Sequence, residues 1–350
     1  MSSNFLKRRF AEQRSVKPYA AKWQLQLAIA ALLTGLAGCA STTTAPTPAS
    51  SAAETADSKP LVVATTPVLC DLTKQIAAST IDLKCLIPTD ADPHVYQTSP
   101  EDSKAIETAQ LVLYAGYNFE PGLIKVIEAS SNTAPKVAVD ELAVPQPLQG
   151  EEGHDHEAAA GEEHDHEGAD PHVWHNAQNG IRITEVINEN LTKLQPNQAI
   201  LYADNTEKLT TELAQIDSWI KTQIATIPAS SRKLVTTHDA LGYYANAYNI
   251  PIEGALSGIT TDEKPTAARV KELVDEVEAS GVPTIFAEST INPNLIETVA
   301  KESNVKVSDQ ELYADTLGAP GSAGDTYQKM LIANTEAIVK GLGGQLTPFQ

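Results

Sequence analysis

The chain is divided by the stretch PNQAILYADNTEKLTTELAQIDSWIKTQIATIP, residues 196–228. It opens on a proline, which suits the first turn of a helix, and it closes on Pro228, which cannot continue one. Between them, one apolar stripe recurs every three or four residues, at Leu209, Leu213, Ile216, Ile220 and Ile224. The stretch therefore predicts one helix of about 28 residues, roughly 40 Å long.

Short apolar runs alternate with amphipathic segments on both sides of this stretch. Before it, the pattern predicts strands at 61–65, 83–88, 111–114 and 136–139, and helices at 68–78, 100–109 and 121–129. After it, the pattern predicts strands at 233–237, 252–255, 284–287 and 305–307, and helices at 241–248, 265–280, 293–303 and 326–342. Alternation of this kind predicts an α/β protein with two lobes, each a parallel sheet of about four strands covered by helices, joined by one long rigid helix. The alternative, in which the long helix lies on the surface of one domain, stays open at this point.

The first 59 residues lie outside the alternation. A basic stretch precedes an apolar run from Trp23 to Leu36, which is too short to favour a membrane-spanning helix. Leu36-Ala37-Gly38-Cys39 then resembles the bacterial lipobox, in which the cysteine is lipidated. We expect a lipoprotein signal peptide at 1–38 and a flexible tether at 39–59, which is rich in Ser, Thr, Ala and Pro. An uncleaved anchor helix is the alternative, and both place the protein outside the cytoplasm.

The remaining chain divides at the long helix. We predict an N-terminal lobe at 60–197, a linker helix at 198–227 and a C-terminal lobe at 228–350. Outside the cytoplasm, Cys70 and Cys85 are able to form a disulfide, and the alternative is two small buried side chains. The net charge is -20, which repels nucleic acid and anionic lipid. We therefore expect no nucleic-acid partner, membrane contact through the N-terminal lipid alone, and a monomer.

The eight histidines fall in three places. His94 follows an expected strand, six histidines lie between residues 154 and 175, and His238 ends another expected strand. Ligands bind open parallel sheets beyond the carboxyl ends of their strands, where His94, His172, His238 and Asp315 are all expected. Imidazole nitrogen is a preferred ligand of zinc, so the sequence predicts a metal site between the lobes.

Five motifs in order resemble the metal-specific solute-binding proteins of ABC importers, the zinc and manganese branch called cluster A-I. The resemblance covers roughly residues 60–345, and its landmarks are Asp92-Pro93-His94, Asp170-Pro171-His172-Val173-Trp174, Thr236-Thr237-His238-Asp239-Ala240, Phe286-Ala287-Glu288 and Leu312-Tyr313-Ala314-Asp315. It implies two α/β lobes joined by a rigid helix, with the metal buried between them, and an importer permease as partner.

The resemblance implies that His94, His172, His238 and Asp315 are the metal ligands. In members that resemble manganese binders, a glutamate commonly stands where His238 stands here. Three nitrogens and one carboxylate favour zinc over manganese, which prefers more oxygen. We therefore expect high-affinity capture of Zn²⁺ and no enzymatic activity, with manganese capture as the alternative. Whether Asp315 binds the ion directly or orients a ligand stays open.

A His- and acid-rich loop interrupts the N-terminal lobe at 150–170. Two histidine pairs, His154 with His156 and His164 with His166, are a candidate low-affinity metal site, because family zinc binders often carry such a loop at this place. The alternative is an inert solvated loop. Two other functions stay open: a periplasmic zinc buffer that uses mainly this loop, and a zinc-dependent hydrolase.

Other side chains near the motifs are expected to have supporting roles. For His175 we expect a surface position, with metal binding or a bond to a ligand as the alternatives. Glu288 is expected to be a structural carboxylate or to hold a ligand. For Tyr96, Trp174 and Tyr243 we expect ordinary core packing rather than a cleft lining.

Overall fold

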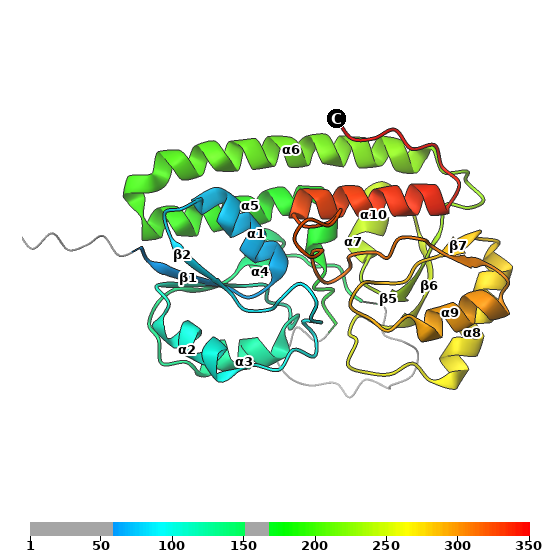
Figure 1. Ribbon diagram of the computed structural model, residues 1–350, viewed down its shortest axis with the longest axis horizontal. Helices are drawn as coiled ribbons and strands as arrows, with labels where there is room; N and C mark the ends of the chain where they lie inside the picture. Colours follow the sequence, from blue (N-terminus) through cyan, green and yellow to red (C-terminus); the bar gives the residue numbers. More distant parts are fainter. Residues whose placement is uncertain (1–58, 151–167) are drawn as a thin grey trace, which may run out of the picture. The chain divides into compact units, whose positions relative to one another are not determined.

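The computed structural model describes residues 59–150 and 168–350, all within one compact unit (Figure 1). The expected signal peptide, Cys39 and almost all of the tether lie outside the described residues. So do the four histidines of the expected low-affinity site, His154, His156, His164 and His166. Within the described ranges, no helix has the length and apolar character needed to cross a membrane.

The N-terminal lobe is built on one parallel sheet with the strand order β2-β1-β3-β4. Its strands are β1 (Leu61–Ala64), β2 (Asp82–Cys85), β3 (Leu111–Tyr114) and β4 (Lys136–Ala138). Its helices are α1 (Pro67–Ala77), α2 (Pro100–Thr108), α3 (Pro121–Ala129), α4 (Val139–Ala143) and α5 (Ala177–Leu194), with a 3-10 turn η1 (Val173–His175) before α5. A proline occupies the first turn of α1, α2 and α3, where its missing N–H is not needed.

The C-terminal lobe pairs its four strands as two parallel ladders, β5-β6 and β7-β8. The strands are β5 (Leu234–His238), β6 (Ile252–Ser257), β7 (Thr284–Ile285) and β8 (Lys306–Val307), and the helices are α7 (Gly242–Tyr248), α8 (Ala267–Ser280), α9 (Asn294–Glu302) and α10 (Tyr327–Gly341). A hydrogen bond of 2.9 Å from the N–H of Phe286 to the carbonyl of Val235 links the two ladders. The four predicted parallel strands are therefore present, but the sheet is interrupted between β5 and β7.

The long connecting helix is α6 (Ala199–Ala225), which follows the 3-10 turn η2 (Pro196–Gln198). All five side chains of the predicted apolar stripe are buried. The helix contacts α1 and α5 of the N-terminal lobe and α10 of the C-terminal lobe, and Figure 1 shows it running along α5 and α10. The predicted α/β architecture with a long connecting helix is confirmed.

The sequence analysis missed α5 altogether. Its buried face includes Ile183, Ile187 and Leu191, which recur every four residues and gave a usable signal. The flanking Asn, Gly and Glu residues dilute the apolar character of this segment. Asn176 caps the start of the helix, because its side chain accepts a hydrogen bond from the N–H of Gln178.

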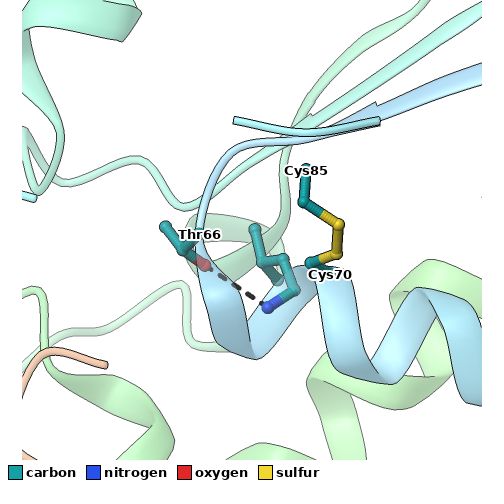
Figure 2. The surroundings of a disulfide bond; sticks show 4 residues. Thr66, Cys70 and Cys85 are labelled. Atoms are coloured by element: carbon teal, nitrogen blue, oxygen red, sulfur yellow. Dashed lines mark hydrogen bonds between the residues drawn. A yellow bond between two sulfur atoms is a disulfide. The ribbon is translucent and has the colours of Figure 1, made fainter. Parts of the chain in front are cut away.

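Cys70 on α1 and Cys85 on β2 form a disulfide in the structure, with their Cα atoms 5.7 Å apart. Figure 2 shows it close to the start of α1, where the Thr66 hydroxyl accepts the N–H of Leu69. β2 is an edge strand, and β1 is its one neighbour in the sheet. The disulfide therefore fixes an edge strand to a helix packed on the sheet.

Candidate metal site

Two loops with the same local geometry present the histidines of the N-terminal lobe. In each Asp-Pro-His motif, the aspartate accepts the backbone N–H of the histidine two residues on, at 3.0 Å for Asp92 and His94 and 2.9 Å for Asp170 and His172. This turn is typical of aspartate, and the proline fixes φ in its centre. His94 follows β2 and His172 precedes η1, so both lie beyond the strand ends of the sheet.

The C-terminal lobe contributes His238 and Asp315. His238 is the last residue of β5, and Asp315 lies in the loop between β8 and α10. Asn334 of α10 anchors that loop, because its side chain accepts the N–H of Tyr313 and donates to the carbonyl of the same residue.

The four side chains meet between the lobes. One donor atom from each lies within 4.8 Å of the others, and all four residues are buried. Asp315 Oδ1 lies 3.2 Å from Nε2 of both His172 and His238, and the Nε2 atoms of His94 and His172 are 3.3 Å apart. Ligand atoms about 2.0–2.1 Å from a tetrahedral zinc ion lie about 3.3 Å from each other, so these spacings fit one such ion.

Carboxylates hold the outer nitrogens of two of the imidazoles. His172 Nδ1 lies 2.8 Å from Asp170 Oδ1, and His238 Nδ1 contacts Glu288 Oε2. Glu288 Oε1 also accepts the backbone N–H groups of Thr237 and His238, each at 2.9 Å. A proton on each Nδ1 leaves the Nε2 lone pair free toward the centre, which is the state that a metal ligand needs.

Charge is concentrated at the centre of the site. Burial opposes the ionised form of Asp315, but His238 and His172 outweigh it and hold its pKa well below the ordinary value. Burial likewise acts to lower the pKa of His172, while Asp170 and Asp315 raise it to about 9. No described residue accepts from the outer nitrogen of His94, and burial outweighs the effect of Asp315 and lowers the pKa of His94 to about 3.

Several polar atoms at this centre have no hydrogen-bond partner among the described residues. They are Nε2 of His238 and both carboxylate oxygens of Asp315. Buried polar atoms without partners are costly, and a cation would satisfy them. The donor set and its unpaired atoms therefore fit a divalent metal ion.

An aromatic wall that the sequence analysis missed closes one side of the site. The ring of Phe119 lies 5.0 Å from that of His94, 5.6 Å from that of His172 and 4.7 Å from that of Trp174. No spacing in the sequence pointed to Phe119, because it comes from a loop between β3 and α3. Such a wall excludes water and strengthens electrostatic contacts inside.

The structure corrects the expectation for His175. Its side chain is buried, and its Nε2 lies 2.8 Å from the carbonyl oxygen of Ala314. Trp174 is also buried, and its indole N–H lies 3.2 Å from the same oxygen. His175 is therefore not a surface residue, although its ring takes no place among the four donor atoms.

The other aromatic residues occupy different surroundings. Tyr243 is buried and donates to the carbonyl of Asp170 at 3.2 Å, beside the His172 motif. Tyr96 is half-buried, and its hydroxyl contacts Asp102 at 3.0 Å, away from the four donor atoms.

The expected second, low-affinity site lies outside the described residues. Its four histidines, His154, His156, His164 and His166, all fall in the range 151–167, which lies outside the described residues. The four donor atoms of the buried site come from other parts of the chain. Metal binding by this loop therefore stays a prediction.

Known proteins with similar sequences are metal-binding proteins of importers. A family model described as zinc-uptake complex component A, periplasmic, matches residues 62–341. The manganese ABC transporter substrate-binding lipoprotein PsaA of Streptococcus mitis is 32% identical over 287 residues, which cover 80% of this chain and 88% of that protein. The metal ABC transporter substrate-binding lipoprotein ScbA of Streptococcus cristatus is 32% identical over 314 residues, which cover 88% and 94%.

A solved structure shows the same arrangement of elements. The periplasmic zinc binding protein TroA from Treponema pallidum matches with a TM-score of 0.73 and 29% sequence identity. The match covers 81% of this chain and 99% of that one.

Proposed function

Because the chain belongs to the cluster A-I family of metal-binding solute-binding proteins, which the model of zinc-uptake complex component A represents, we propose that it captures Zn²⁺ between its lobes for an ABC importer. His94, His172, His238 and Asp315 bind the ion, and the permease of the importer receives it. The protein works outside the cytoplasmic membrane, where lipid on Cys39 holds it and residues 39–59 tether it.

The single observation that carries this proposal is the buried set of three imidazole nitrogens and one carboxylate, all within 4.8 Å of one another. Three nitrogens and one oxygen so close together suit zinc, which accepts four ligands of this kind. Manganese prefers more oxygen ligands and a higher coordination number, which these four residues supply less well.

Manganese capture is the second candidate. The name of one relative favours it, since PsaA is described as a manganese protein, whereas ScbA is described only as a metal protein. Both oxygens of Asp315 face imidazoles, with Oδ2 3.7 Å from His94 Nε2. Bidentate binding by this carboxylate would give a fifth ligand, which moves the site toward manganese.

Metal competition on the purified protein separates the two candidates. The protein is stripped with a chelator and then equilibrated with zinc and manganese together, and the bound metal is counted per chain. We expect one zinc ion per chain at equal concentrations of the two metals, and zinc still bound when manganese is in large excess. Retention of manganese under these conditions would instead support the second candidate.

A pair of variants tests the site itself. Asp315→Asn removes the negative ligand at the buried centre and is expected to abolish tight binding. Asp309→Asn changes an exposed aspartate earlier in the same loop between β8 and α10, and as the matched control it should bind like the unaltered protein. Equal binding by both variants would rule out this site.

Two rival functions need their own tests. Deletion of residues 151–169, which removes His154, His156, His164 and His166 together, should leave one tight ion. A zinc buffer that depends on the loop would instead lose nearly all its capacity. Hydrolase activity that tracks bound zinc and disappears in His238→Ala would favour an enzyme instead of a carrier.

A further inference from the structure

Two buried side chains of the N-terminal lobe converge on one backbone carbonyl of the C-terminal lobe. Nε2 of His175 lies 2.8 Å and Nε1 of Trp174 3.2 Å from the oxygen of Ala314. A carbonyl oxygen has two lone pairs, so the two N–H groups use both of them. The peptide between Ala314 and Asp315 is thereby fixed from two directions.

A single turn and one hydrogen bond connect two of the proposed ligands. His172 begins a single turn that ends at His175, and Asp315 follows the carbonyl that this turn holds. Tyr327 at the start of α10 holds the turn from its other side, because its hydroxyl donates to the carbonyl of Trp174 at 2.5 Å. These hydrogen bonds join a ligand of one lobe to a ligand of the other.

The chemistry of the contact shows what the imidazole supplies. A carbonyl oxygen only accepts, so Nε2 of His175 must carry a proton. Burial lowers the pKa of the ring to about 4, so Nδ1 is bare at neutral pH. Nδ1 is buried without a hydrogen-bond partner among the described residues. An unpaired buried polar atom is destabilising, and an apolar side chain of similar size would avoid that cost. The N–H at Nε2 is therefore what distinguishes histidine from leucine at this position.

We propose that His175 is a positioning residue that fixes the carboxylate of Asp315 relative to His172 before the metal ion arrives. This inference rests on the proposed function. It implies that His172 and Asp315 already lie in their binding positions before the ion arrives. Less conformational entropy is then lost when the ion binds, so its affinity is higher.

The test compares His175→Leu, which removes the N–H, with His175→Gln, whose amide restores a donor at similar reach. The zinc dissociation constant is measured by competition with a chelator, and Co²⁺ is used as a spectroscopic probe of ligand geometry. We expect His175→Leu to weaken zinc binding about 10–100-fold and to change the Co²⁺ absorption bands. His175→Gln should recover most of the affinity and the original bands.

A matched control removes a buried hydrogen bond elsewhere. Thr335→Val deletes the 2.9 Å contact between the hydroxyls of Thr335 and Tyr244, both of which are buried. It should lower the free energy of unfolding without changing the zinc dissociation constant or the Co²⁺ bands. A merely structural role for His175 predicts that His175→Leu behaves in the same way as this control, which would overturn the inference.

A second measurement uses the unaltered protein, so it tests the inference even if His175→Leu fails to fold. NMR of labelled imidazole nitrogens should show a neutral His175 with its proton on Nε2 in the metal-free protein. A proton on Nδ1 with Nε2 bare would leave no donor for the carbonyl of Ala314 and would overturn the inference. If the unaltered protein binds no divalent ion at all, both the proposed function and this inference fail. If it binds zinc tightly and His175→Leu binds zinc equally tightly, only the inference fails.

Discussion

Glu288 holds His238 through three contacts, two to backbone N–H groups and one to the imidazole. A neutral amide in its place still accepts hydrogen bonds but makes the imidazole a weaker base. We expect Glu288→Gln to weaken zinc binding about 10–100-fold, as is usual when a carboxylate behind a ligating histidine is lost.

Chelator competition measures this change. Glu278→Gln, an exposed glutamate on α8, is the control and should leave the dissociation constant unchanged. Unaltered affinity in Glu288→Gln would mean that its backbone contacts alone position His238.

Glu120 is a buried carboxylate at the start of α3 that takes no part in the metal site. Its Oε1 accepts the Thr65 hydroxyl at 2.7 Å and the Ala115 N–H at 2.8 Å, and burial raises its pKa from 4.5 to about 7. Between these two values the folded chain keeps a proton that the unfolded chain releases. Its contribution therefore destabilises the fold progressively as the pH rises from 4.5 to about 7.

We expect Glu120→Gln to flatten this part of the pH dependence, which is worth about 3 kcal/mol for a shift of this size. Urea unfolding of the metal-free protein at about pH 5 and pH 8 measures it. Glu128→Gln, an exposed glutamate on α3, is the control and should keep the original pH dependence. A Glu120→Gln protein that loses as much stability as the parent over this range would show that Glu120 is already ionised.

Single residues differ in how far the sequence predicted them. The four proposed ligands were predicted together because each lies in a short motif that follows a predicted strand and resembles a motif of the metal-binding family. The contact of Asp170 with the ring of His172 and the packing of Phe119 depend on side-chain directions, which no spacing reveals. His175 was wrongly expected at the surface, because its burial comes from Ala314, which is far away in the sequence.

At the scale of elements, the disulfide joins α1 to the edge strand β2 across a sequence separation of 15 residues. A crosslink over a loop of this length stabilises a fold by about 3 kcal/mol, mainly because it restricts the unfolded chain. We expect the double variant Cys70→Ala/Cys85→Ala to lose roughly that amount in urea unfolding under oxidising conditions.

The control for this prediction is unfolding of both proteins in a strong reductant, where the difference should nearly disappear. Equal stability under oxidising conditions would indicate that the two cysteines contribute packing and no restraint.

Elements with strong periodicity were predicted well. The helix α6 followed from its stripe and its two prolines, because these are local signals. α5 was missed although its apolar residues recur every four positions, because the polar residues between them dilute that pattern, and packing against α6 adds to its stability. β2 ends at Cys85, before the predicted end of its strand, although Leu86 and Ile87 still donate to the carbonyls of Ala64 and Thr65.

At the scale of the whole molecule, a bound ion should stabilise both lobes at once. Zinc at about a thousand times its dissociation constant adds about 4 kcal/mol to the free energy of unfolding. Because two ligands come from each lobe, we expect slower hydrogen exchange in β1 and in β5 together. His94→Ala should remove the effect in both strands, and protection confined to one lobe would contradict a shared site.

The two-lobe arrangement was predictable because strand–helix alternation and motif order are properties of the whole chain. The break between the two ladders of the C-terminal lobe was not, since β7 and β8 have two residues each and their pairing depends on packing.

The open edges of the N-terminal sheet have a consequence for crowding. β2 and β4, the two edges, are only four and three residues long, and they carry Lys84 and Lys136. Unpaired strand edges invite other chains to add to them, and short, lysine-bearing edges discourage it. At high local concentration, these short edges therefore oppose aggregation of one sheet with another.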